Sequence, residues 1–288
     1  MQTVHRIAEL RALLADRRRA GERIALVPTM GNLHQGHIHL VEVAKTLADY
    51  SVATIFVNPM QFGPKEDFNS YPRTLQEDSR QLTAVGLDLL FAPPVAEVYP
   101  NGLDKLTRVE VPELSDILCG ASRPGHFAGV ATVVSKLFNM VQPDVALFGE
   151  KDWQQLLVIR RFTADLNFPV EVVGVSTVRE ADGLAMSSRN GYLTAAERAV
   201  APTLYATMQA AAARLQAGER DYGAIQRDAC ATLEQAGFRP DYFEIRRAHD
   251  LTSPEEGDTE LRLLAAAWLG KARLIDNCPV KVPVSVRC

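Results

Sequence analysis

The sequence predicts an α/β fold: a Rossmann-like, doubly wound parallel sheet followed by a smaller α+β domain at the C-terminus. In the first half of the chain, short apolar runs typical of buried parallel strands alternate with helical stretches, as in βαβ units. After Val178 the pattern changes to Ala-rich helices followed by strand-like runs. We therefore expect one domain over residues 1–177 and a second over 178–288.

The first domain is expected to contain five buried strands and the helices between them. The strand candidates, rich in Val, Ile, Leu and Ala, lie at 24–27, 51–57, 88–92, 144–148 and 170–175. The helix candidates lie in the charged, amphipathic first 20 residues and at 38–50, 74–85, 129–141 and 152–166. Parallel strands joined by right-handed crossovers end at one edge of the sheet, so a ligand is expected beyond their carboxyl ends.

The second domain is expected to begin with helices and to end with strands. An Ala-rich helix is predicted from about 195 to 217 and another from 221 to 236, with strands at 241–246 and 261–269. No internal repeat or Gly/Ser-rich linker separates the domains, so a boundary near 175–180 rests on the change of pattern alone.

The composition is that of an ordinary globular protein, with 47% hydrophobic and 23% charged residues among 288. The net charge of -4 argues against a protein whose main task is to bind nucleic acid or an anionic membrane. No apolar run approaches the roughly 20 residues that span a bilayer, and the N-terminus lacks a signal peptide's apolar centre. We therefore expect a cytoplasmic protein with neither nucleic-acid nor membrane partners.

The cysteines predict neither a disulfide framework nor a zinc ribbon. They form no CxxC pair and have no metal-ligand spacing to a histidine. The four cysteines are Cys119, Cys230, Cys278 and Cys288.

The corner after the first strand, Pro28-Thr-Met-Gly-Asn-Leu-His-Gln-Gly-His37, is the first segment that suggests chemistry. Gly31 and Gly36 allow the backbone to approach a ligand, and the helix expected to begin near residue 38 offers N–H groups to phosphate. His34 and His37 add ring N–H donors. The alternative is that the histidines only bond the backbone of a turn. A zinc site is a weaker interpretation of these histidines than either of the others, because no carboxylate or cysteine completes the ligand set.

Two standard nucleotide-binding loops are missing from the sequence. The chain contains no GxxxxGK[ST] and no GxGxxG after a strand. Both a Walker-type ATPase and a classical dinucleotide oxidoreductase therefore lack their diagnostic loops.

Neutral amides follow the second predicted strand, in Phe56-Val-Asn-Pro-Met-Gln-Phe-Gly63. Asn58 and Gln61 would lie at the same sheet edge as His34, where amides suit the recognition of hydroxyl and carboxylate groups. The alternative is a capped turn over the core.

Thr74 is predicted to cap the next helix, with Glu77 completing a capping box three residues later. This gives Glu77 and Asp78 a structural explanation at the start of the helix. Glu77 or Asp78 could also reach a magnesium ion held mainly by phosphates, which needs only one or two protein carboxylates.

Cationic side chains lie on three further loops of this net-acidic chain. Arg123 begins the segment RPGHFAGV, and Lys151 lies in GEKDWQQ after the fourth predicted strand, with Gln155 expected on the same helix face. Ser187, Ser188 and Arg189 form a hydroxyl-rich, cationic loop suited to closing over phosphates. The alternative for each cation is a solvated surface role.

In this order, the segments resemble the pantothenate synthetase (pantoate–β-alanine ligase) family. The matching motifs are PTMGNLHQGH, FVNPMQFG, YPRTLQED, RPGHFAGVATVVSKLFNMVQPD, FGEKDWQQ and READGLAMSSRN, within residues 24–195. HQGH is similar to the HIGH signature of class I aminoacyl-tRNA synthetases and nucleotidylyltransferases, and MSSRN to their KMSKS loop. The last hundred residues match only in general character, and Gln35 stands where family members often carry an acidic residue.

The resemblance implies an ATP-dependent ligase that condenses pantoate with β-alanine, giving pantothenate, AMP and pyrophosphate. It implies a pantoyl adenylate bound to the enzyme, with no covalent enzyme intermediate. ATP, pantoate and β-alanine would be substrates, Mg2+ would accompany the ATP phosphates, and the protein would be a homodimer.

The resemblance also implies roles for individual residues. The residues with implied catalytic roles are His34, His37, Lys151 and Arg189. The residues implied to contact ATP are Met30, Gly36, His37, Gly149, Lys151, Asp152, Val178, Met186, Ser187, Ser188 and Arg189. Pantoate would be held by Gln61 and Gln155 with Asn58 nearby, and Arg123 and His126 would line the side of the cavity that holds β-alanine and phosphate. Asp78 or Glu77 would help to hold magnesium.

Three other functions remain open at this level. A nucleotidylyltransferase could use the same histidine corner, but it keeps AMP in its product, whereas a ligase releases it. An aminoacyl-tRNA synthetase would need a large basic tRNA-binding domain, which is not evident. A nucleotide-sensing module without turnover would bind ATP and release nothing.

Overall fold

The computed structural model describes residues 1–64, 66 and 68–283, and Cys288 lies outside this range. The chain forms two compact units. The first comprises Met1–Glu150 and Gln155–Ser176; the second comprises Lys151–Gln154 and the chain from Thr177 onward.

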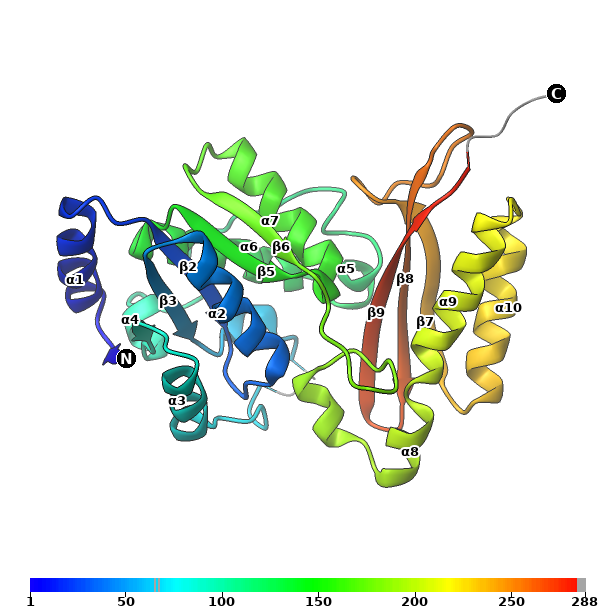
Figure 1. Cartoon of the computed structure of the whole chain (residues 1–288), viewed down its shortest axis with the longest axis horizontal. Helices are drawn as coiled ribbons and strands as arrows, with labels where there is room; N and C mark the ends of the chain where they lie inside the picture. The colour runs from blue at the N-terminus through cyan, green and yellow to red at the C-terminus, as the bar shows by residue number, and fades with distance from the viewer. Residues whose placement is uncertain (65, 67, 284–288) are drawn as a thin grey trace. The chain divides into compact units, whose positions relative to one another are not determined.

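Within the described residues, the first unit is built on a six-stranded sheet whose strands are all parallel (Figure 1). Its order is β1-β4-β3-β2-β5-β6. The strands are β1 (Gln2–Val4), β2 (Ile24–Thr29), β3 (Tyr50–Ile55), β4 (Leu89–Phe91), β5 (Val145–Gly149) and β6 (Glu171–Val175). The order reverses between β2 and β5, which is the switch point where doubly wound folds bind their ligands.

Helices cover both faces of this sheet. They are α1 (Ile7–Arg19), α2 (Gln35–Leu47), α3 (Leu75–Ala84), α4 (Val95–Val98), α5 (Cys119–Ser122), α6 (His126–Val141) and α7 (Trp153–Asp165). Alternate strand residues face opposite sides. Val27 and Leu147 therefore pack into the cluster under α2 and α3, whereas Phe148 contacts the Phe138 ring of α6.

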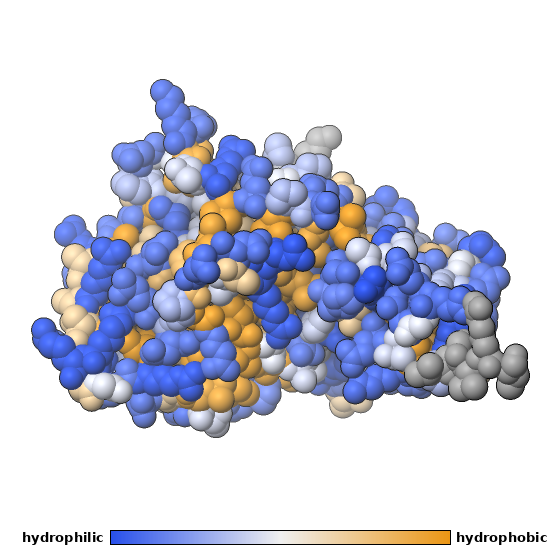
Figure 2. Space-filling model, turned by 90° about the horizontal axis from the view of Figure 1, so that it is seen from above, coloured by the Kyte–Doolittle hydropathy of each residue, from blue (hydrophilic) through white to orange (hydrophobic). Residues whose placement is uncertain are grey.

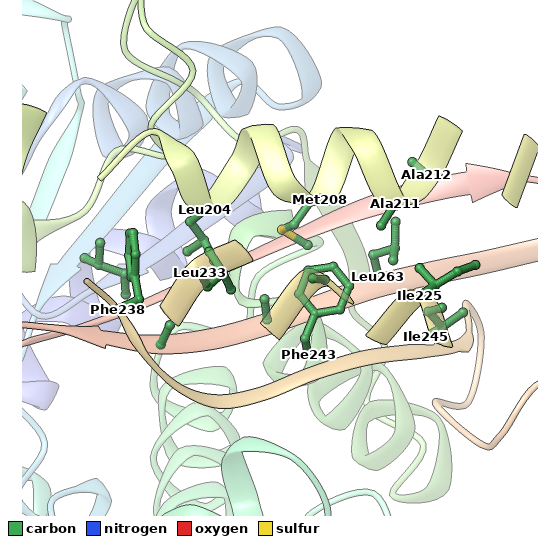
Figure 3. Close-up of a cluster of buried hydrophobic side chains, with 14 of the residues drawn as sticks. Leu204, Met208, Ala211, Ala212, Ile225, Leu233, Phe238, Phe243, Ile245 and Leu263 are labelled. Carbon is green, nitrogen blue, oxygen red and sulfur yellow. The ribbon is translucent and has the colours of Figure 1, made fainter. Parts of the chain in front are cut away.

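The second unit joins helices to an antiparallel sheet, of which the described residues form three strands in the order β7-β8-β9. Its elements are α8 (Ala195–Val200), α9 (Thr203–Gln216), α10 (Tyr222–Gln235), β7 (Arg239–Arg247), β8 (Glu260–Leu269) and β9 (Ala272–Lys281). Figure 3 shows side chains of α9 and α10, among them Met208 and Ile225, packed against Phe243 and Leu263 of the sheet. The sheet therefore has one face in a hydrophobic core.

The five strands predicted for the first unit are present, and the sequence patterns missed two others. β1 occupies part of the predicted N-terminal helix, because three residues are too few to show a strand period but suffice to pair with β4. β9 was missed because its alternation is interrupted by the polar pair Asp276–Asn277 and by Pro279. Both of these strands are detected only through their partners in the sheet.

Two helix predictions also need correction. The helix expected over 195–217 is divided into α8 and α9, because Pro202 has no N–H to continue the first helix. The helix expected near residue 38 begins at Gln35, so His34 is its N-cap and His37 lies in its first turn.

The N-terminus of α8 carries a complete capping box. The Thr194 hydroxyl accepts from the backbone N of Glu197 at 3.3 Å, and the Glu197 carboxylate accepts from the backbone N of Thr194 at 2.8 Å. Thr194→Ala is expected to lower the free energy of unfolding by about 1 kcal/mol in urea denaturation, because it removes this cap. Thr232→Ala is the matched control, since its hydroxyl only bonds Asp228 O one turn earlier within α10. An equal loss in the two variants would contradict the capping role.

The face shown in Figure 2 is mostly hydrophilic, with apolar residues gathered in one area of it. No helix among the described residues combines the length and the apolar character needed to cross a bilayer. The three described cysteines, Cys119, Cys230 and Cys278, are free thiols.

Candidate active site

A left-handed corner carries the chain from β2 to α2. Gly31 has φ +81° and Asn32 has φ +51°, a region that disfavours bulky side chains. The carboxylate of Asp78, in α3, fixes the corner: Oδ2 accepts from Asn32 N and Oδ1 from Leu33 N, both at 2.9 Å. Asp78 is 1% exposed, and Thr74 donates its hydroxyl to Oδ2 at 3.1 Å. Asp78 therefore acts as a buried anchor of the corner.

The two histidines of the corner cap α2 reciprocally. Nδ1 of His34 accepts from Gly36 N at 3.1 Å, and Nδ1 of His37 accepts from His34 N at 3.3 Å. In a neutral ring whose Nδ1 accepts, the proton is on Nε2. The two ring centroids are 4.1 Å apart. The caps therefore hold two Nε2–H donors side by side at the start of a helix.

The Gln61 side chain lies against this corner. Its Nε2 is 3.2 Å from Sδ of Met30, and its Oε1 accepts from Asn58 Nδ2 at 3.0 Å. Asn58 is 1% exposed and is held by Gly129 O and by the Tyr99 hydroxyl, which donates to Oδ1 at 2.7 Å. Burial raises the pKa of Tyr99, so this hydroxyl keeps its proton. The described contacts of Asn58 thus orient Gln61.

Arg123 and His126 hold the main chain of the same turn. His126 Nδ1 donates to Gln61 O at 2.9 Å, while its Nε2 accepts from Arg123 at 3.0 Å. Arg123 also forms a two-point ion pair with Glu66, at 2.6 and 2.7 Å. Burial alone would raise the pKa of Glu66, but the hydrogen bond and charge of Arg123 lower it below its ordinary value. Arg123 and His126, which are predicted on the β-alanine side, therefore both bond the Gln61 carbonyl in this structure.

Gly129 of α6 is where the helix backbone meets the Gln61 turn. A Cβ placed there would lie 2.5 Å from Met60 O and 2.8 Å from Gln61 Cα. These contacts are with backbone rather than with a flexible side chain, so any larger residue must displace the turn.

Gly129→Ala is therefore expected to lower kcat/KM for the ligand expected at Gln61 by about tenfold to 100-fold, since a misplacement near 1 Å has effects of this size. KM for the nucleotide expected at the histidine corner should change less, and both constants are measured by steady-state kinetics. Gly223→Ala in α10 is the control, because its Cβ would meet only side-chain atoms, the flexible end of Arg227 at 3.2 Å and Asp221 Oδ1 at 3.6 Å. Wild-type kinetics in Gly129→Ala would show that the turn does not depend on this contact.

Lys151 lies in a 3-10 turn, η2 (Glu150–Asp152), rather than on α7, which begins at Trp153. The prediction that Lys151 and Gln155 share a helix face is therefore wrong. Lys151 Nζ is 3.9 Å from Asp152 Oδ2, and Asn277 of β9 donates to Lys151 O at 2.8 Å. These contacts lie within the second unit.

The Met186–Arg189 segment follows a short hairpin of the second unit. Met186 N donates to Val178 O at 3.0 Å, and Ser187 caps η3 (Ser188–Tyr192) by accepting from Arg189 N at 3.2 Å. Arg179 closes the hairpin. Burial alone would lower the pKa of its guanidinium, but the hydrogen bond and charge of Asp276 raise this pKa above its ordinary value. Arg179 is therefore a permanent cation at the base of the Ser-Ser-Arg loop.

The structure gives the two predicted magnesium ligands other partners. Asp78 anchors the corner, and Glu77 is paired with Arg80 at 2.6 Å on the exposed side of α3. The predicted Thr74–Glu77 capping box is wrong, because Thr74 makes no side-chain cap and bonds Asp78 instead. Within the described residues, no group of three His, Cys, Asp or Glu side chains is arranged to hold a metal ion.

In the first unit, the structure thus brings together His34 with His37, and Met30 with Gln61 and Asn58. The sequence patterns assigned no role to several residues that support the site: Glu66, Tyr99, Gly129, Asp276 and Asn277. Glu66 lies three residues after the FVNPMQFG segment and Gly129 lies within RPGHFAGV, so both were close to a recognised motif. The others lie in stretches with no local chemical signature.

Comparisons with known proteins cover almost the whole chain. The family model described as Pantoate-beta-alanine ligase matches residues 2–279. The chain is 61% identical to the Pantothenate synthetase of Thioalkalivibrio sulfidiphilus, over 99% of this chain and 100% of that protein. It is 58% identical to the Pantothenate synthetase of Pseudomonas aeruginosa, over 97% and 99%.

Solved structures agree with these matches. The crystal structure of the pantothenate synthetase from Thermus thermophilus superposes with a TM-score of 0.90 at 48% identity, covering 96% of this chain and 99% of that one. The Francisella tularensis pantoate-beta-alanine ligase, complexed with beta-gamma ATP and beta-alanine, gives 0.81 at 32% identity over 96% and 97%.

Proposed function

Because this chain belongs to the pantoate-beta-alanine ligase family, and so is an ATP-dependent ligase of pantothenate biosynthesis, we propose how its residues divide the reaction. In the first step, a pantoate carboxylate oxygen attacks the α-phosphorus of ATP and pyrophosphate leaves. In the second, the β-alanine amine attacks the acyl carbon of pantoyl adenylate, and AMP leaves as the new amide loses a proton. The enzyme forms no covalent bond to any of the three substrates.

His34 and His37 act at the α-phosphate in this proposal. Their Nε2–H groups and the N-terminus of α2 are donors fixed in advance by the capping bonds, which suits charge that develops in the transition state. Met30 and Gly36 shape the same nucleotide corner.

Gln61 holds pantoate by its hydroxyl and carboxylate groups, with Gln155 as the second amide. The observation that carries this assignment is the 3.2 Å contact between Gln61 and Met30, because it brings an acid-binding amide to the nucleotide corner. Asn58 orients Gln61 from behind. Arg123 and His126 fix the carbonyl of Gln61 and are assigned to the side that holds β-alanine.

The second unit supplies the cations for ATP. Lys151 and Arg189 stabilise the triphosphate charge, with the Ser187 and Ser188 hydroxyls as further donors. The remaining ATP contacts are assigned to Gly149, Asp152, Val178 and Met186.

Magnesium enters as the MgATP substrate in this proposal. Asp78 already accepts three hydrogen bonds from the protein, and Glu77 is paired with Arg80, so neither carboxylate suits a resident ion. ATP phosphates commonly carry magnesium with few protein ligands.

The protein is also proposed to be a cytoplasmic homodimer. The family resemblance supports the dimer, as does the apolar area visible in Figure 2. Light scattering that shows a monomer at micromolar concentration would overturn this assignment.

The decisive experiment follows AMP and pyrophosphate with each substrate omitted in turn. Pantoate alone should support exchange of labelled pyrophosphate into ATP, while net AMP release should require β-alanine as well. 18O placed in the pantoate carboxylate should appear in AMP. With all three substrates present, sustained pyrophosphate release without AMP would instead indicate a nucleotidylyltransferase, and ATP binding without turnover would indicate a sensing module.

A further inference from the structure

We propose that Asp276 and Asn277, adjacent residues of β9, are positioning residues that hold two ATP-binding segments of the second unit in their working geometry. The inference rests on the proposed function, because it takes Lys151 and the Ser187–Arg189 loop to contact ATP. Neither Asp276 nor Asn277 needs to touch a substrate for this role.

The strand geometry lets one dipeptide serve two segments. Successive residues of a strand point to opposite faces of the sheet. Ala272, Leu274 and Val280 of β9 pack into the helix-covered core, so Asp276 shares their face and Asn277 points to the other. Both polar side chains are buried, each 4% exposed.

Asn277 fixes the backbone of the Lys151 turn. Its Nδ2 donates to Lys151 O at 2.8 Å. The same segment is held a second time through Trp153, whose Nε1 donates to Ala248 O at 3.0 Å and whose ring lies under the Arg262 guanidinium at 3.4 Å. Fixing the Lys151 carbonyl sets the direction in which this residue's side chain leaves the backbone.

Asp276 fixes the hairpin that precedes the Ser-Ser-Arg loop. Its carboxylate accepts from both terminal nitrogens of Arg179, at 2.6 and 2.9 Å. Arg179 in turn donates to Gly183 O at 3.1 Å and stacks on Tyr205 at 3.5 Å. A backbone bridge between Arg179 and Ala185 then leads directly to Met186 and the loop.

The Asp276 side chain is also coupled to the backbone of Asn277. Asn277 N donates to Asp276 Oδ1 at 2.8 Å, so the oxygen that holds Arg179 also holds the backbone of Asn277. Buried polar networks of this kind specify one arrangement only when all their members are present. A change at either residue should therefore disturb ATP binding more than the fold.

Asn277→Asp is the sharpest test, because it keeps the shape of the side chain and replaces the donor to Lys151 O by an oxygen. We expect KM for ATP, and Kd for a non-hydrolysable β,γ-substituted ATP, to rise about tenfold, as for the loss of one hydrogen bond. KM for β-alanine should remain near wild type, whereas the thermal midpoint should fall, because the variant buries a carboxylate oxygen against the Lys151 carbonyl. An unchanged Kd for the ATP analogue would overturn the proposal.

Asp276→Asn is compared with Asp241→Asn, because each variant weakens an arginine–aspartate pair of the same sheet. Asp241 pairs with Arg273 at 2.6 and 3.0 Å, and neither residue contacts the two ATP-binding segments through these bonds. Only Asp276→Asn should weaken binding of the ATP analogue. Equal losses in both variants would show that the effect comes from general loosening of the sheet.

A double-mutant cycle separates positioning from stability. If Asn277 acts through Lys151, Asn277→Asp should weaken analogue binding less in a Lys151→Ala background than in the wild type. Fully additive effects would contradict the proposal. Failure of the proposed function is a distinct outcome, because wild-type protein would then show no pantoate-dependent pyrophosphate exchange.

Discussion

His37→Ala and His34→Ala should each lower the rate of adenylate formation by about 100- to 1,000-fold, the usual effect of removing one preorganised donor from a developing anion. The rate is measured as the pyrophosphate burst in a single turnover with pantoate and ATP. Each variant should remain folded, because loss of a helix cap has an effect of only about 1 kcal/mol.

A cap-preserving variant separates the two roles of the histidine corner. Asparagine is a favoured N-cap, so His34→Asn should keep the hydrogen bond from Gly36 N while it removes the Nε2–H donor. The control is His39→Ala, since His39 is exposed on the same helix and contacts Glu42 at 3.2 Å. Near-normal adenylate formation in His34→Asn would falsify the phosphate role and leave the histidine a structural cap.

Asp78→Ala should reduce both stability and activity, because it leaves the backbone N–H groups of Asn32 and Leu33 without their acceptor. Hydrogen bonds to a charged group contribute about 1.5–3 kcal/mol each, so the free energy of unfolding should fall by about 3 kcal/mol or more in urea denaturation. Release of the corner should also lower kcat by about 100-fold.

Glu77→Gln is the matched control for Asp78. It changes the neighbouring carboxylate, whose partners are Arg80 and Gln81 on the exposed side of α3. Its effect on stability should stay within about 0.5 kcal/mol. When MgATP is held fixed, the free magnesium concentration that gives half-maximal activity should be the same in Glu77→Gln and the wild type. A large rise in this concentration would support the prediction that Glu77 is a magnesium ligand.

Local sequence patterns predicted the central sheet because its inner strands, β2 to β5, are buried on both faces and therefore read as continuous apolar runs. They also singled out the segments around His34, Gln61 and Lys151, because each follows such a strand at the edge where parallel strands end. The start of α2 was placed three residues too late, since histidine is an unusual N-cap and gave no capping signal.

The supporting residues could not be predicted in the same way. The sequence pattern indicates a helix start or a magnesium ligand for Asp78, whereas two of its hydrogen-bond partners lie more than 40 residues earlier. Gly129 matters only because the turn at Met60 lies against it, and Asn277 only because β9 passes the Lys151 turn. Each of these contacts joins segments distant in sequence, so their meaning appears only once the chain is folded.

The capping bonds of His34 and His37 have a consequence for metal inhibition. A transition metal binds imidazole through a nitrogen lone pair, and in both rings the backbone of α2 already occupies the lone pair of Nδ1. Chelation through Nε2 would require the ring proton to move to Nδ1, which would break the cap. The corner should therefore discriminate against zinc and nickel while presenting N–H groups to anions, despite its HxxH spacing.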